Sequence, residues 1–293
     1  MATTVKQAFL ELKQRLEISD LQAETVSTRQ TNVRKAVENK LIVLDSFLTG
    51  SYSRNTMIAP LSEADIDIFV VLDAKYYYNY NGQNGGQAGL LDLLKRTLKE
   101  TYTRTPDISR NGQAVTIQFE DFIVDVVPAF HRQGGGYLIA DSVKQQWIAT
   151  DPKKHVLIVT EANKQHNNDL VPLIKMIKGW NKNNGKYFRS FHLEVLTLEI
   201  LNNVEISSYS SGMRYFLDKG RTQITKQNYD PAGYGGDIGS YLDTGEKVDE
   251  AVSKFDDAYY IALKAESYEQ NGYTSQAIAE WKKLFGGYFP VYG

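Results

Sequence analysis

The sequence of 293 residues contains no cysteine, and this absence excludes several classes of protein. Disulfide-stapled folds, thiolate zinc sites and cysteine nucleophiles all need that residue, so a metal ion must be bound through oxygen or imidazole. Histidine is scarce too, and no pair has the spacing of a metal-binding motif. The four histidines, which we interpret as structural or surface residues, are His131, His155, His166 and His192.

Long apolar runs are also missing. No stretch reaches the roughly 18 apolar residues that a membrane span needs. The opening segment, MATTVKQAFLELKQRLEIS, lacks the basic region and apolar run of a secretory signal. The net charge of −2 does not favour strong binding to nucleic acid. We therefore expect a cytoplasmic protein that uses no membrane partner.

Two common catalytic motifs are absent as well. The sequence has no G-x-x-x-x-G-K-[ST] phosphate loop and no G-x-S-x-G nucleophile elbow. The glycine run 134–136 lacks the strand-to-helix context of a phosphate cradle, so we interpret it as a flexible loop. P-loop and serine-hydrolase chemistry are thereby disfavoured.

Hydrophobic periodicity predicts helices at the amino end and through most of the second half. No fixed-period repeat is visible, which disfavours solenoids and propellers. The helical spacing covers residues 5–18, 28–44, 90–102, 170–181, 190–202, 248–271 and 275–285.

Strand-like segments gather in the first half instead. They cover 46–49, 65–72 and a hairpin of 113–119 with 121–127, which we expect Pro128 to end. The polar stretch 79–89 reads as a loop, and Pro106 as a helix breaker. Together these patterns predict an α+β lobe with a mixed β-sheet, packed on a helical carboxy-terminal lobe.

Three aspartates indicate a metal-binding site. On a strand, alternate side chains share a face, so Asp65 and Asp67 project together while Ile66 points the opposite way. Asp125 lies in the apolar run FIVDVV, where an unpaired charge would be costly. Clustered carboxylates repel unless cations lie between them, and hard oxygen ligands select Mg²⁺ or Mn²⁺. A single D-x-D is common, but here a third aspartate and an upstream Gly-Ser turn accompany it.

The Gly-Ser turn is Gly50-Ser51, which follows the first expected strand. Glycine permits close approach of a phosphate to the backbone, and the amide and hydroxyl of Ser51 can donate hydrogen bonds to it. Glu120 and Asp121 are weaker candidates, because carboxylates at a hairpin are ordinarily solvated. The pattern therefore predicts a metal and phosphate site built on adjacent strands.

These residues resemble a known family. The runs GSYSRNTMIAPLSEADIDIFVVL and IVDVVPAF are similar to the nucleotidyltransferase core of DNA polymerase β, oligoadenylate synthase and cyclic GMP-AMP synthase. The likeness is nearer to the bacterial CD-NTases, the cyclic-oligonucleotide synthases of anti-phage signalling. It extends through LVPLIKMIKGWNK, SFHLEVL and DPAGYGGDIGSYL to WKKLFGGYFP.

The resemblance implies roles for individual residues. Gly50 and Ser51 would grip the donor triphosphate, and the three aspartates would hold two Mg²⁺ ions, or Mn²⁺. Lys178 and Ser190 would contact the same phosphates; from residue chemistry alone, Lys178 would be read as a solvated helix face. The implied domains are a catalytic lobe over 1–160, with the amino-terminal helices, and a helical lobe over 161–293 that completes the nucleotide cleft.

The implied activity is template-independent synthesis of a cyclic oligonucleotide from NTPs with release of pyrophosphate. A dinucleotide ring is favoured, in bacterial anti-phage signalling with regulatory or effector proteins of an anti-phage operon as partners. One alternative is transfer to another acceptor, such as a tRNA end, a protein hydroxyl or an antibiotic. A noncatalytic nucleotide-binding module is the third reading, which the intact carboxylates disfavour.

Overall fold

The computed structural model describes residues 1–104 and 107–293. The expected breaker at Pro106 therefore lies outside the described residues. The chain divides into two compact units, one formed by Ile18–Val156 and the other by Met1–Glu17 together with Leu157–Gly293. Each unit has its own set of elements.

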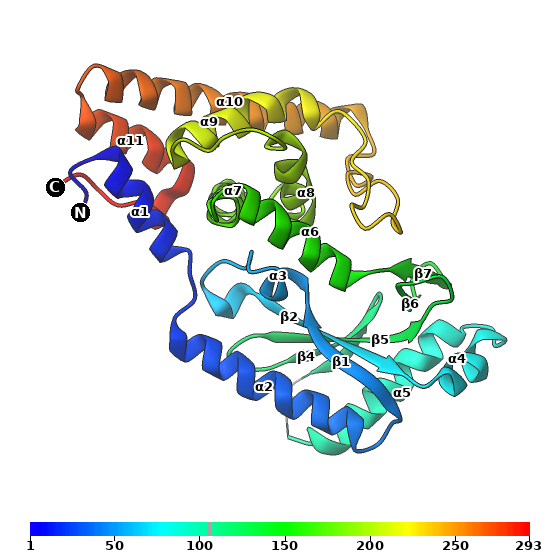
Figure 1. Cartoon of the computed structure of the whole chain (residues 1–293). Helices are drawn as coiled ribbons and strands as arrows, with labels where there is room; N and C mark the ends of the chain where they lie inside the picture. Colours follow the sequence, from blue (N-terminus) through cyan, green and yellow to red (C-terminus); the bar gives the residue numbers. More distant parts are fainter. Residues whose placement is uncertain (105–106) are drawn as a thin grey trace. The chain divides into compact units, whose positions relative to one another are not determined.

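The unit Ile18–Val156 combines a mixed sheet with helices (Figure 1). Its strands are β1 (Val43–Thr49), β2 (Asp65–Leu72), β3 (Ile108–Asn111), β4 (Ala114–Gln118), β5 (Ile123–His131), β6 (Tyr137–Asp141) and β7 (Gln146–Thr150). Its helices are α2 (Asp20–Glu38), α3 (Gly50–Ser53), η1 (Leu61–Glu63), α4 (Ala74–Asn81) and α5 (Gly86–Thr101).

The sheet places β2 and β5 at its centre. The strand order is β1-β2-β5-β4-β3, and β6 extends the far end of β5 and pairs with β7. Only the central pair is parallel among the described ladders; the others are antiparallel. The expected mixed β-sheet is confirmed, and so is the hairpin of β4 with β5.

Alternation along β2 decides which face is packed. Ile66, Ile68 and Val70 point into the main core of this unit, where they meet apolar residues of α2 and α5. Figure 1 shows these two helices on one side of the sheet. Asp65 and Asp67 are left on the opposite face, as the period of two requires.

Pro128 does not end its strand, so that expectation is wrong. Strand β5 continues to His131, and Pro128 pairs with Val70 of β2. The antiparallel partner of β5 changes at this point, because pairing with β4 ends at Val126 and pairing with β6 begins at Ala129. The missing N–H of proline therefore interrupts no antiparallel ladder.

Two other boundaries differ from expectation. The stretch 79–89 is not all loop, since α5 begins at Gly86, where a Cβ would lie 1.8 Å from the Tyr80 carbonyl oxygen. Helix α2 begins at Asp20, eight residues before the expected start at 28. Ser19 and Gln22 form a capping box there, a sequence signal that the periodicity alone does not reveal.

The other unit is helical. It contains α1 (Val5–Arg15), α7 (Leu170–Asn183), α8 (Ser190–Ile200), α9 (Tyr209–Gln223), α10 (Gly245–Gln270), α11 (Thr274–Phe285) and η2 (Gly286–Tyr288). The division between the units falls within α6 (Pro152–Gln165). Helix α7 is buried along most of its length, so it forms the centre of this unit.

Helix α1 packs in the helical unit, which differs from the expected lobe 1–160. Phe9 lies edge-on to Trp281 at 4.9 Å and to Phe289 at 5.2 Å between ring centroids. All three side chains are buried, and such aromatic pairs contribute beyond their buried area. The amino-terminal segment of the helical unit therefore ends at Glu17, and the sheet unit begins at Ile18.

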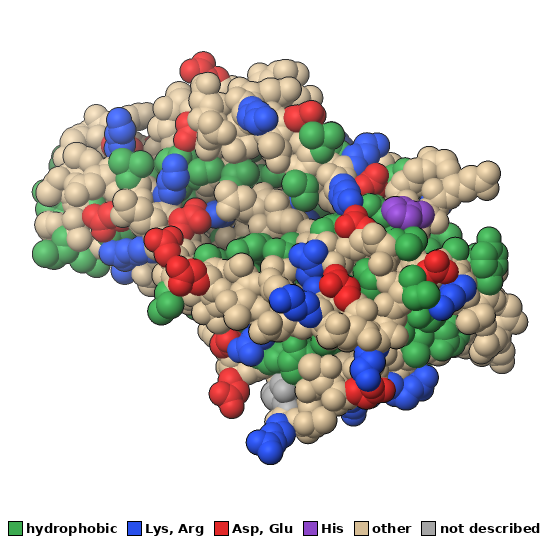
Figure 2. Space-filling model, turned by 60° about the horizontal axis from the view of Figure 1, so that its bottom comes forward, with side chains coloured by type: hydrophobic (Ala, Val, Ile, Leu, Met, Phe, Trp, Pro, Cys, Tyr) green, Lys and Arg blue, Asp and Glu red, His purple; other side chains and the backbone are tan. Residues whose placement is uncertain are grey.

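Charge is distributed evenly on the visible surface. Figure 2 shows Lys and Arg side chains interspersed with Asp and Glu on the face that it presents. Among the described helices, none combines the length and apolarity needed to cross a bilayer.

Candidate active site

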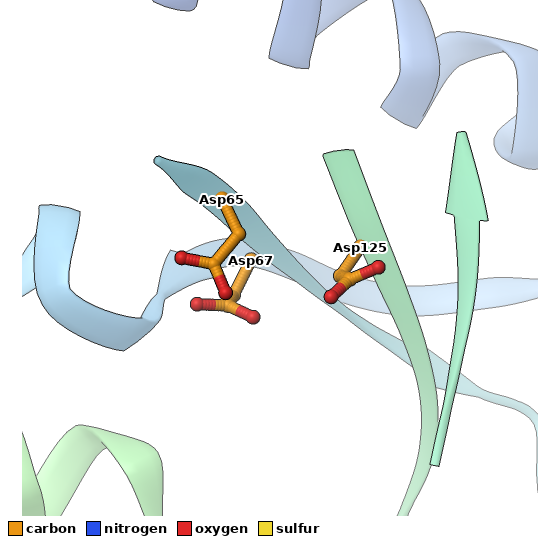
Figure 3. A group of neighbouring side chains, drawn as sticks. All are labelled: Asp65, Asp67 and Asp125. Carbon is orange, nitrogen blue, oxygen red and sulfur yellow. The ribbon is translucent and has the colours of Figure 1, made fainter. Parts of the chain in front are cut away.

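The three aspartates predicted from the sequence lie together on two neighbouring strands. Asp65 and Asp67 are on β2, and Asp125 is on β5, directly opposite Asp67 in the parallel register. Each offers a carboxylate oxygen that lies within 4.8 Å of the others. Figure 3 shows the three carboxylates extending from these adjacent strands. The tertiary structure thus brings together residues that are 60 positions apart in the chain.

A polar row crosses the sheet at this level. Thr49 of β1 pairs with Asp67, Asp67 with Asp125, and Thr116 of β4 pairs with Asp125. The Thr116 hydroxyl donates a hydrogen bond of 2.5 Å to Oδ1 of Asp125. This bond orients one carboxylate of the triad. Sequence reasoning missed Thr116, although pairing its strand with that of Asp125 could have indicated it.

Burial and mutual repulsion disfavour the ionisation of all three carboxyl groups at once. Burial, followed by the nearby charges of Asp65 and Asp125, raises the pKa of Asp67 to about 7. Burial also raises the pKa of Asp125, against the lowering effect of the Thr116 hydrogen bond. Arg54 acts in the opposite direction on Asp67. A site that resists holding three negative charges is one in which a cation would be stabilised.

The donor set therefore fits divalent cations. Three carboxylates with oxygens this close match the hard-oxygen ligands of Mg²⁺ and Mn²⁺, and no softer ligand is present in the cluster. The arrangement has the acidic triad typical of nucleotidyltransferases. Asp65, the most exposed of the three, is the first residue of β2.

Gly50 and Ser51 occupy the turn beside the triad. Strand β1 ends at Thr49, and the four residues that follow form the short helix α3. Gly50 adopts a positive φ of 67°, a conformation that favours glycine. The expected strand entering a Gly-Ser turn is confirmed. The first-turn N–H groups of such a helix have no intrahelical acceptor, which suits them to bind an anion.

Lys178 and Ser190 belong to the helical unit. Ser190 is exposed at the first position of α8. Lys178 lies on α7 with only 6% of its side chain exposed, and its Nζ is 2.8 Å from Oε1 of the buried Glu194. Lys178 is therefore not on a solvated face. Contact of either residue with phosphate stays a prediction.

Comparisons with known proteins place this geometry in a family. The sequence profile of the SMODS domain, the Second Messenger Oligonucleotide or Dinucleotide Synthetase domain, matches residues 3–167. The chain is 28% identical to the cyclic AMP-AMP-AMP synthase of Acinetobacter sp. (strain ATCC 27244 / 9458), over 98% of this chain and 86% of that protein.

Two solved structures share the fold. The DncV cyclic AMP-GMP synthase of Vibrio cholerae superposes with a TM-score of 0.76 at 15% identity, over 99% of this chain and 98% of DncV. CdnC of E. coli MS115-1, in its complex with HORMA-deltaN, superposes with a TM-score of 0.76 at 15% identity, over 98% and 99% of the two chains.

The profile match spans more than half of the sequence and includes all three aspartates. The superpositions show that the chain shares the α+β fold of DncV and CdnC. The chain belongs to the SMODS family and is a bacterial CD-NTase, a nucleotidyltransferase of the cyclic nucleotide synthase class.

Proposed function

We propose that this protein joins NTPs into a cyclic oligonucleotide and releases pyrophosphate, with Asp65, Asp67 and Asp125 as its metal ligands. The observation that carries the proposal is the direct pairing of Asp67 with Asp125 in a cluster whose oxygens lie within 4.8 Å of one another. When bound, two Mg²⁺ ions would supply activation of the attacking ribose hydroxyl and charge neutralisation at the leaving pyrophosphate.

The residues of the chain would position the metal ligands and the donor triphosphate. Thr116 orients the Asp125 carboxylate, and the turn at Gly50 and Ser51 lies beside Asp67, where the donor triphosphate is expected. Ser51 can donate its amide and hydroxyl to the phosphates. Lys178 and Ser190 are assigned to the same phosphates from the family resemblance.

A ring requires at least two phosphodiester bonds, whereas the described residues contain one acidic triad. One site therefore acts repeatedly, and the linear intermediate is rebound with its triphosphate at the aspartates. The sequence favours a cyclic dinucleotide. A three-nucleotide ring is the second candidate, because the relative matched over 98% of the chain is named a cyclic AMP-AMP-AMP synthase.

The proposed setting is bacterial anti-phage signalling. The partners are NTPs together with regulatory or effector proteins encoded with the enzyme. The complex of the structural relative CdnC with a HORMA protein supports a regulatory partner of this kind.

Incubation of the purified protein with all four NTPs, Mg²⁺ and no acceptor tests the proposal. We expect phosphatase-resistant products, and mass spectrometry would distinguish a ring of two nucleotides from one of three. Asp67→Asn is the inactive control. Turnover only after an RNA, protein or small-molecule acceptor is added would instead establish the alternative transferase. Products that are all linear and phosphatase-sensitive would refute cyclisation.

A further inference from the structure

Thr116 lies on β4, on the face of the sheet that carries the aspartates. It is directly opposite Asp125 in the antiparallel register, and such a pair places its Cβ atoms about 5 Å apart on one face. Its chain neighbours Val115 and Ile117 point to the opposite face, where both are buried in the core. The strand register therefore brings the Thr116 hydroxyl to the Asp125 carboxylate.

The core behind the strand fixes the position of this hydroxyl. Val115 pairs with Val126 and Ile117 pairs with Val124, and all four side chains are fully buried. A slip of β4 by one residue would turn Thr116 into the core and Val115 or Ile117 onto the polar face. Threonine is also branched at Cβ, which restricts its χ1 torsion. Backbone and side chain thus both limit where the donor can lie.

The hydrogen bond from Thr116 makes the carboxylates of the triad unequal. Oδ1 of Asp125 accepts this bond at 2.5 Å, whereas within residues 1–104 and 107–293 no other side chain donates to the three aspartates. Oδ2 of Asp125 accepts no hydrogen bond in that part of the chain, so it is the oxygen open to a cation. Because the carboxylate is held at Oδ1, its second oxygen keeps a defined direction.

We propose that Thr116 is a positioning residue that sets the affinity of the triad for a divalent cation by directing Oδ2 of Asp125 toward it. Partners that hydrogen-bond a ligating carboxylate fix its orientation, and their removal typically weakens metal binding or activity by about 10- to 100-fold. Thr116 touches neither the ion nor the nucleotide and acts through Asp125. All the residues involved belong to the unit Ile18–Val156. This inference rests on the proposed function, because it concerns the same three ligands.

Thr116→Val tests the inference, because it removes the hydroxyl and keeps a branched side chain that favours a strand. Calorimetric titration of the nucleotide-free protein with Mn²⁺ measures the half-saturating concentration, which we expect to rise about tenfold. Thr116→Ser keeps the donor and should bind Mn²⁺ nearly as well as wild type. Asp67→Asn identifies the part of the signal that belongs to the triad.

Thr150→Val is the matched control. Thr150 is a strand threonine of the same unit, on β7, and its hydroxyl forms no hydrogen bond within the described chain. This variant should keep both the Mn²⁺ affinity and the turnover of wild type. A bond that served the fold alone would lower the Tm of Thr116→Val and leave its Mn²⁺ half-saturation unchanged. That result would overturn the inference.

The dependence of turnover on Mg²⁺ gives a second readout. Thr116→Val should need about tenfold more Mg²⁺ for half-maximal pyrophosphate release, and its deficit should shrink as Mg²⁺ rises, because the variant is impaired in holding the ion. A deficit of the same size at every Mg²⁺ concentration would contradict an effect on affinity.

The Mn²⁺ titration also separates this inference from the proposed function. Weaker Mn²⁺ binding by Thr116→Val supports the inference even if wild type forms no product from NTPs, a result that would refute the proposed function alone. Identical titrations of wild type and Asp67→Asn would show that the triad holds no cation and would refute both.

Discussion

Gly50 and Asp67 approach so closely that no side chain fits between them. A Cβ built on Gly50 would lie 1.7 Å from Oδ2 of Asp67, well inside van der Waals contact. Gly50 also has a positive φ of 67°. The glycine is therefore required both by its conformation and by the space that the carboxylate occupies.

Gly50→Ala should displace the Asp67 carboxylate and reduce turnover by on the order of a hundredfold or more, because a misplaced ligand costs orders of magnitude in rate. The matched control is Gly112→Ala. Gly112 has a similar φ of 59°, but nothing lies within 4 Å of a Cβ there. Steady-state kinetics and thermal unfolding compare the turnover and the stability of the two variants. Equal loss of activity in the two would show that backbone strain, and not the clash with Asp67, is responsible.

Asp65→Asn, Asp67→Asn and Asp125→Asn should each abolish turnover in a folded protein. Losing a metal ligand removes several kcal/mol of transition-state stabilisation, on the order of a thousandfold or more in rate. Pyrophosphate release measures turnover, and circular dichroism checks folding. Asp20→Asn, an exposed aspartate in the first turn of α2, should retain activity. Full activity of Asp67→Asn would end the assignment.

The raised pKa of Asp67 predicts how stability depends on pH without divalent ions. The folded protein binds this proton up to about pH 7, whereas the unfolded chain releases it near the ordinary aspartate pKa of 3.8. The folded state therefore holds more protons between these values, and the free energy of unfolding falls as pH rises, by at most about 1.4 kcal/mol per pH unit.

Thermal unfolding in EDTA between pH 5 and 8 tests this dependence, and Mg²⁺ should raise the Tm more at pH 8 than at pH 5. In Asp67→Asn, whose amide never ionises, the slope with pH should be smaller. Identical slopes in the variant and the wild type would contradict the role of Asp67.

The ion pair of Lys178 with Glu194 predicts a loss of stability on substitution. The side chains are 6% and 1% exposed, so Lys178→Met leaves a buried carboxylate without this cation, a change that costs about 3 to 5 kcal/mol in comparable pairs. Lys247→Met is the control, because its 2.6 Å pair with Asp243 lies in solvent and should matter little. Chemical denaturation measures both. An unaltered midpoint for Lys178→Met would show that the buried pair is not needed for folding.

Local pattern was sufficient to locate β2 and the acidic triad. The run from Asp65 to Leu72 coincides with the observed strand, and its period of two separates the aspartates from the core. Helices α7, α8, α10 and α11 were likewise predicted within a few residues, because the pattern of apolar residues along a helix is a property of neighbouring positions. Helices α4, α6 and α9 and strands β3, β6 and β7 were not predicted from the sequence.

By itself, then, the sequence determined the α+β class, the triad and the turn at Gly50, which depend on residue type and short spacing. Only the tertiary structure decided that Thr116 bonds to Asp125, that Lys178 pairs with Glu194, and that α1 joins the helical unit. These contacts join residues distant in the chain, and strand register or helix packing is set by burial across the whole core. Local propensity carries no information about such pairings, so no reading of single segments could have supplied them.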